Sequence, residues 1–179
     1  MTWRIVTPQA GMPAITEHST PATVEVVGST TITNKLCPLG TIVRAVDETY
    51  GEGEFIRLLG VGSTVVGSMV TWSATTFQTA LSPNTAGTGS SFAWAMAATV
   101  AGEHGWYQIS GLVVAKKTNV TWEPQKPVYQ SATTGRVMDT AASGKQVVGA
   151  QSANLTTVTS TTSTIVLQVN RPHNTGVII

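Results

Sequence analysis

Apolar and polar residues alternate in short runs along this chain of 179 residues, and Gly, Pro, Asn or Ser separates most runs from the next. A period of two places successive side chains on opposite faces of an extended strand. The pattern predicts strands at residues 23–27, 41–46, 54–59, 68–73, 91–99, 106–115, 118–122, 128–130, 146–150 and 165–170. Many short strands separated by turn residues are typical of an antiparallel β-barrel or β-sandwich.

The stretch "FAWAMAATVA", residues 92–101, could also form a helix, because alanine is frequent there. Phe92, Trp94 and Met96 alternate with the alanines, which favours a strand with one face of large residues. The composition agrees with this choice, since Thr occurs 30 times and Val 22 times. Both residues are branched at Cβ and pack better on a pleated sheet than in a helix. The sequence therefore predicts an all-β protein.

The first 36 residues differ from the rest of the chain. Pro8, Pro13 and Pro21 interrupt every short apolar run in this segment. Proline donates no hydrogen bond and is poorly suited to the centre of a sheet. We expect residues 1–36 to form an extended arm that lies on the domain or on a neighbouring subunit, and residues 37–179 to form a single β domain. We expect these residues to become ordered on a neighbour, so that their deletion leaves a folded domain that binds its partner weakly.

Charge is sparse and evenly mixed, at 11% of residues and a net charge of +1. No basic stripe is present to neutralise a row of phosphates, so we expect no nucleic-acid partner. No polybasic segment and no apolar run of about 20 residues is present, so we expect no membrane partner. The N-terminal residues lack a charged region followed by an apolar block, which predicts synthesis in the cytoplasm without a signal peptide.

Residues that carry chemistry are few. Cys37 is the only cysteine, so it forms no disulfide within the chain and no multi-thiolate metal site. His18, His104 and His173 stand far apart in the sequence, without the spacing of a metal-binding motif. Cys37 lies between Leu36 and Pro38, where a buried structural thiol is the ordinary outcome. The sequence predicts no catalytic, cofactor-binding or metal-binding residues, and no cofactor.

One acidic cluster stands out, formed by Asp47, Glu48, Glu52 and Glu54. Calcium binds several oxygen ligands from a flexible loop, and this cluster could supply some of them. The spacing matches no defined calcium loop, however, and charged turns between strands are common. We interpret these residues as turn residues that hold no obligatory metal.

The five tryptophans allow two interpretations. Exposed indole rings bind sugars by stacking on their apolar faces, whereas buried ones fill the core of a sheet that is poor in leucine. We expect most of them to be buried; they are Trp3, Trp72, Trp94, Trp106 and Trp122.

The stretch "AGEHGWYQISG", residues 101–111, combines a histidine, an acid and two aromatic residues. It could be a catalytic loop with His104 as the base. The alternative is a turn that contains His104, followed by a strand from Trp106 with Trp106 as a packing anchor. The run from Trp106 to Ala115 contains no charge, which favours a strand in the middle of a sheet, where both faces are covered or one face meets a partner subunit.

The same stretch resembles a known family. Gly105, Trp106, Gln108 and Gly111 give the pattern "G-W-x-Q-x-x-G", preceded by Gly102 and a strand of small residues. This pattern, followed by a Val/Ala strand and a "V-Y" strand, is similar to a segment of small virion proteins of tailed bacteriophages. Capsid decoration proteins, also called head cement or stabilisation proteins, are the closest in kind. The resemblance covers about residues 55 to 150, within "GSMVTW", "AWAMAATVAG", "KPVYQSATTGRV" and "GKQVVGAQSA".

The resemblance implies a β-barrel or sandwich-like module without catalytic residues that attaches to the outside of an assembled capsid shell. The expected partners are the major capsid protein and further copies of this chain, as a homo-trimer. A tail-tube subunit or a tail-fibre module is the nearest alternative. A carbohydrate-binding module, favoured by the tryptophans, and a small hydrolase that uses His104 with an acid are the alternatives from other classes.

Overall fold

The fold is that of a computed structural model, which describes residues 1–8, 12–19, 24–27, 30–33 and 37–176. Within these residues every regular element is a strand, and no helix long and apolar enough to cross a membrane occurs. All pairs between named strands are antiparallel. The predicted all-β class is confirmed.

In chain order the strands are β1 (Arg4–Ile5), β2 (His18–Ser19), β3 (Val24–Val27), β4 (Thr30–Thr33), β5 (Ile42–Asp47), β6 (Gly51–Leu59), β7 (Met69–Trp72), β8 (Thr79–Leu81), β9 (Phe92–Ala95), β10 (His104–Lys116), β11 (Pro127–Gln130), β12 (Val137–Met138), β13 (Gln146–Ser152) and β14 (Thr164–Asn174). The pattern of alternation located most of the longer strands to within a few residues. It missed β1, β2, β4, β8 and β12, which have at most four residues each.

The prediction of a strand at residues 118–122 is wrong. Only Trp122 makes a bridge there, to Val158. The backbone instead curls around the Lys117 ammonium, whose Nζ donates to the carbonyl oxygens of Thr118 (3.2 Å) and Val120 (2.7 Å). Lys117 has no exposed surface, so its charge must find acceptors inside the protein. This requirement outweighs the strand preference of the neighbouring Val and Thr residues.

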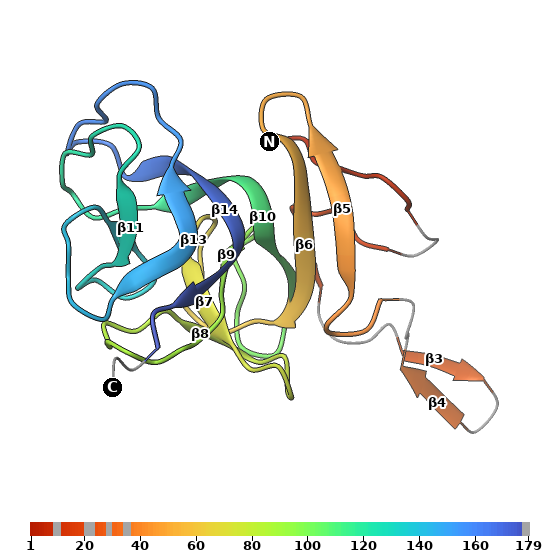
Figure 1. The fold of residues 1–179 in the computed structure, drawn as a ribbon. Coiled ribbons are helices and arrows are strands. Elements are labelled where there is room, and N and C mark those ends of the chain that lie inside the picture. The colour runs from red at the N-terminus through yellow and green to blue at the C-terminus, as the bar shows by residue number, and fades with distance from the viewer. Residues whose placement is uncertain (9–11, 20–23, 28–29, 34–36, 177–179) are drawn as a thin grey trace.

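One large sheet organises the molecule, with strand order β1-β5-β6-β10-β14-β13-β11-β12. β9 also pairs with β10, β7 pairs with β8 and β9, and β2 pairs with β10. The sheet folds over on itself, and Figure 1 shows β7, β8 and β9 behind β13 and β14. The backbone N–H of Met69, at the start of β7, donates to the carbonyl of Gly135 (2.9 Å), just before β12.

Strand β10 lies at the centre of this arrangement, and its residues enter three groups of buried side chains. Trp106 belongs to the first group, Tyr107 and Ile109 to the second, and Val113 and Ala115 to the third. Both faces of the strand are therefore covered, which is one of the two arrangements that the uncharged run predicted. The strand begins at His104, two residues earlier than expected, because β10 continues its pairing with β6 as far as Leu59.

The "G-W-x-Q-x-x-G" residues have structural roles in β10. A bulge interrupts its pairing with β6 between Gln108 and Ser110. The Gln108 side chain bridges this bulge, since its Nε2 donates to the carbonyls of Ser110 and Leu112, both at 3.0 Å. Gly111 has a φ of +95°, and a Cβ there would lie 2.4 Å from the carbonyl oxygen of Glu52. Only glycine fits this close approach without a shift of the backbone.

The first residues of the chain form an N-terminal strap, by which we mean the described residues 1–8 and 12–19. Its strand β1 pairs with β5, and its strand β2 pairs with the start of β10. Trp3 is 7% exposed and Ile15 has no exposed surface, because both pack against the group that contains Trp106. The indole Nε1 of Trp106 donates to the carbonyl of Pro13 (3.2 Å). The strap is thus part of the core of its own chain.

The hairpin of β3 and β4 is a separate two-stranded sheet. Figure 1 shows it standing away from the main sheet, on the side of β5. The predicted arm therefore contains two different parts, a strap that lies on the domain and a hairpin that stands apart from it. The boundary between residues 36 and 37 stays a prediction.

Candidate functional site

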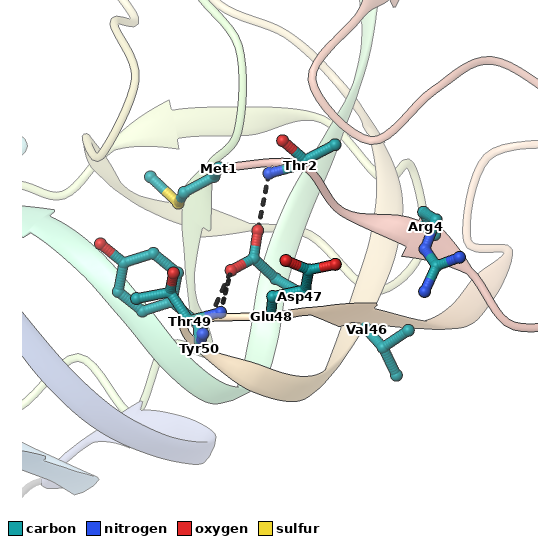
Figure 2. A pocket seen from close by; sticks show the side chains of 8 residues that line it. All are labelled: Met1, Thr2, Arg4, Val46, Asp47, Glu48, Thr49 and Tyr50. Atoms are coloured by element: carbon teal, nitrogen blue, oxygen red, sulfur yellow. Dashed lines mark hydrogen bonds between the residues drawn. The ribbon is translucent and has the colours of Figure 1, made fainter.

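An open hollow of about 650 Å³ lies where the strap meets the turn between β5 and β6. Figure 2 shows the residues around it: Met1, Thr2, Arg4, Val46, Asp47, Glu48, Thr49 and Tyr50. Asp47 and Glu48 belong to the acidic cluster singled out in the sequence. The hollow is therefore a candidate ligand site for the acidic cluster.

The carboxylate of Asp47 is fully engaged by backbone donors, as the dashed lines in Figure 2 show. Oδ2 accepts from the N–H of Thr2 (2.6 Å), and Oδ1 accepts from the N–H groups of Thr49 (2.9 Å) and Tyr50 (3.1 Å). Burial by itself raises the pKa of Asp47, but the three donors together outweigh it and hold the pKa below its ordinary value of 3.8. Asp47 is thus a structural link between the strap and the β5–β6 turn.

Replacing Asp47 by asparagine is expected to lower the free energy of unfolding at neutral pH by about 1.5–3 kcal/mol, the usual worth of hydrogen bonds to a charged acceptor. Because the folded pKa lies below the unfolded value, the contribution is present above pH 3.8 and is lost as the pH falls through the folded pKa. The measurement is urea unfolding at several pH values, with the exposed neighbour Glu48→Gln as control. If the Asp47→Asn variant loses the same free energy of unfolding below the folded pKa of Asp47 as above it, the role of the ionised carboxylate is contradicted.

Of the other acidic residues of the cluster, only Glu48 lines the hollow. Glu52 pairs with Arg44, and Glu54 pairs with Arg171, with 3.0 Å between Oε2 and Nη2. Glu48 is exposed at the rim of the hollow. Among the residues that the structure describes, no group of three or more His, Cys, Asp or Glu side chains could hold a metal ion.

We therefore expect a chelator such as EDTA to leave the melting temperature unchanged. A metal bound only to the folded state would raise the apparent stability, and its removal would lower the midpoint of thermal unfolding. Differential scanning calorimetry with and without EDTA makes this comparison, and added Ca²⁺ serves as the reverse control. A large drop that calcium restores would show that the cluster binds metal.

His104 is the first residue of β10 rather than a turn residue, and its side chain is half-buried. Burial lowers its pKa, and the nearby Arg57 cation lowers it further. The acid next to it in the sequence, Glu103, turns back to accept from the N–H of Val100 with Oε2 (2.9 Å). A histidine base is activated by a carboxylate that accepts from its ring. His104 instead has a cation nearby, and the carboxylate of Glu103 accepts within its own turn.

The other candidate residues lie at separate places. The backbone of His18, in β2, pairs with Gly105 directly beside His104, which the sequence did not predict. His173 lies in β14, opposite Val148 of β13. Cys37 is half-buried against the Trp106 group, and burial raises the pKa of its thiol although Arg57 and Thr41 oppose this. A raised pKa keeps the less reactive thiol form.

The expectation that most tryptophans are buried is confirmed. Trp3, Trp94, Trp106 and Trp122 are at most 7% exposed. Only Trp72 is partly exposed, and it stacks on Phe77 with 6.4 Å between ring centroids. Trp72 lines a cavity of about 210 Å³, together with Ile42, Ile56, Ser91, Phe92, Ile109, Arg171 and Pro172. A single half-covered ring offers a sugar much less stacking surface than several exposed tryptophans would.

A buried amide network shows how the remaining polar side chains are used. Asn174 Nδ2 donates to Gln130 Oε1 (3.0 Å), and Asn174 Oδ1 accepts from the backbone N–H of Thr88 (2.7 Å). Gln130 Nε2 in turn donates to the carbonyl of Pro83 (3.0 Å). Gln130 and Asn174 have no exposed surface. The network therefore fixes the end of β14 to the adjoining loops and presents nothing to solvent.

Two surface features of the described residues stand out: the hairpin of β3 and β4 is a sheet of its own, and Val65, Val66 and Val100 are exposed on two loops joined by a hydrogen bond. Compared with models of known protein families and with curated proteins, the chain matches none of them.

Proposed function

We propose that this protein is a non-enzymatic structural component of a tailed-bacteriophage virion that binds the outside of the capsid shell and stabilises it. Its partners are the major capsid protein and further copies of itself in a homo-trimer. It is made in the host cytoplasm and ends on the capsid surface. The observation that carries this proposal is the β3–β4 hairpin.

An isolated two-stranded hairpin is at best marginally stable in water. The β3–β4 hairpin pairs with neither edge of the main sheet and has four residues in each strand. Seven of its eight strand residues are Val, Thr or Ile, which favour extended backbone. A hairpin of this kind gains stability when a partner surface covers it. A shell of identical subunits offers such a surface at every lattice position.

A second feature supports a contact role. Val65, Val66 and Val100 are 46%, 44% and 58% exposed. The loops that carry them are held together, since the N–H of Thr99 donates to the carbonyl of Thr64. Apolar side chains gathered on a surface mark interaction sites more often than single exposed ones do.

The test is immunogold electron microscopy of virions from cells that produce this protein, with an antibody against the chain. Label on the outside of filled heads is expected, and the head fraction of a gradient should contain the protein at a fixed ratio to the major shell subunit. Label on tails would favour the tail-tube or tail-fibre alternative. Absence from virions would overturn the proposal.

Two variants test whether the β3–β4 hairpin and the exposed valines are the surfaces that contact the head. Replacing residues 24–33 by a short Gly-Ser linker, or Val100 by Asp, is expected to leave thermal unfolding unchanged and to reduce co-sedimentation with heads. Leu155→Asp is the matched control, because Leu155 is 91% exposed and lies outside the valine group. Equal loss of head binding in the control would show that these surfaces are not the contacts.

A further inference from the structure

The N-terminal strap fills an apolar site that is built entirely from later parts of the chain. Trp3 and Ile15 supply the strap side of the buried group, and Trp3 meets Phe55 edge to face with 4.8 Å between ring centroids. The receiving side chains come from β5, β6, β10 and the residue after β9; they are Val43, Ala45, Phe55, Met96 and Trp106. The site therefore exists independently of which chain provides the strap.

Directional bonds fix the strap along its length. Thr2 donates to Asp47, and the N–H of Val6 donates to the carbonyl of Arg44 (2.9 Å). Further along, the carbonyl of Pro13 accepts from Trp106. Each bond joins the strap to a residue beyond position 36. None of them requires that the strap and its site belong to the same polypeptide.

Residues 20–36 connect the strap to its site. The two ends of the hairpin lie side by side, since Val24 pairs with Thr33, so residues 20–23 and 34–36 provide the reach, up to about 23 Å at about 3.3 Å per residue. This stretch includes the β3–β4 hairpin, which stands away from the main sheet (Figure 1). The connection can therefore lead back to the chain's own site or across to a neighbour. When identical contacts form within or between chains, protein concentration and the connection decide between the two.

We propose that the strap is exchanged between copies of this chain, so that the strap of one copy occupies the β5–β6–β10 site of a second copy. The occupant follows from the complementarity already present in the fold, because the segment that fits the site is the strap, residues 1–8 and 12–19, of the same sequence. The exchanged form has every contact of the closed monomer. It is a property of the protein alone and does not depend on binding to a capsid.

Single-cysteine chains test the exchange. In a Cys37→Ser background, one chain carries Arg4→Cys and another carries Val46→Cys. Arg4 and Val46 are paired across β1 and β5, a geometry that suits a disulfide. Refolded together under oxidising conditions, the two chains are expected to give a mixed disulfide-linked species whose yield rises with protein concentration. A chain that carries both cysteines shows that the pair closes within one polypeptide.

The matched control is the pair Thr71→Cys and Ala80→Cys on separate chains. These positions face each other across β7 and β8, whose connection is too short for exchange. If the strap pair gives no more linked product than this control at any concentration, the proposal is overturned. Sedimentation of the unmodified chain adds a second readout: exchange predicts oligomers after refolding at high concentration that persist on dilution. A monomer at every refolding concentration overturns it equally.

Discussion

Replacing Trp3 and Ile15 together by alanine is expected to lower the free energy of unfolding by roughly 5 kcal/mol or more. Truncating a buried Trp costs about 3–5 kcal/mol and truncating a buried Ile about 2–5 kcal/mol, although neighbouring sites do not add fully. Both residues lie in the strap and are buried against the Trp106 group. The loss is comparable to the whole stability of many domains. Urea unfolding followed by tryptophan fluorescence measures it.

Arg4→Ala with Val6→Ala is the matched control, because both residues are exposed in the same strap. Its expected effect is within about 1 kcal/mol, as for surface positions generally. The comparison also tests whether the strap is the separable arm that the sequence predicts. If the double core variant, or a chain without residues 1–16, unfolds at the same urea concentration as the full chain, the strap is dispensable for folding.

Truncating Trp106 to alanine is expected to cost roughly 3–5 kcal/mol, the usual range for a fully buried Trp. Its ring has no exposed surface and packs between the strap and the β5–β6 face. The Arg57 guanidinium carbon lies 5.5 Å from the ring centroid, and Nε1 donates to Pro13. The variant therefore loses core packing, a cation–π contact and a hydrogen bond to the strap. The midpoint of denaturant unfolding gives the size of the loss.

His104→Ala is the comparison that separates the two interpretations of residues 101–111. Since His104 is half-buried at the start of β10, its truncation is expected to cost less than about 1 kcal/mol. Trp106→Phe, which keeps an aromatic ring, should fall between the two. A His104→Ala chain that folds normally but loses a hydrolytic activity, or a Trp106→Ala chain that folds normally but loses a ligand, would establish a functional site in this stretch.

Local sequence located the longer strands because their alternation is strong. In β5, for example, Val43 and Ala45 are buried while Ile42 and Arg44 are exposed. The two-residue strands β1 and β2 are too short to show a period, so their pairing depends on the surface that receives them. Residues 118–122 have the composition of a strand, but the buried Lys117 ammonium draws their carbonyl groups inward.

At the candidate site, too, local sequence did not show which distant residues the acidic cluster contacts. The sequence predicted turn residues, but only Glu48 lies in the turn: Asp47 ends β5, and Glu52 and Glu54 lie in β6, because the strands pair up to Asp47 and Gly51. The sequence could not show that Asp47 binds the backbone of Thr2 or that Glu54 pairs with Arg171, because these contacts join residues that lie far apart in the chain. The proximity of Arg57 to both His104 and Cys37 is likewise a product of strand register.

By itself, the sequence determined that this chain is all-β, that β10 lies in the middle of a sheet and that most tryptophans belong to the core. These properties follow from side-chain branching, period and apolar content, which act locally. Only the tertiary structure decided where the first residues lie. Proline breaks the pattern between residues 1 and 36, yet Trp3 and Ile15 are buried by β5, β6 and β10. Burial of this kind depends on an apolar face assembled from strands that are distant in the sequence. The local pattern of residues within the strap cannot predict that face.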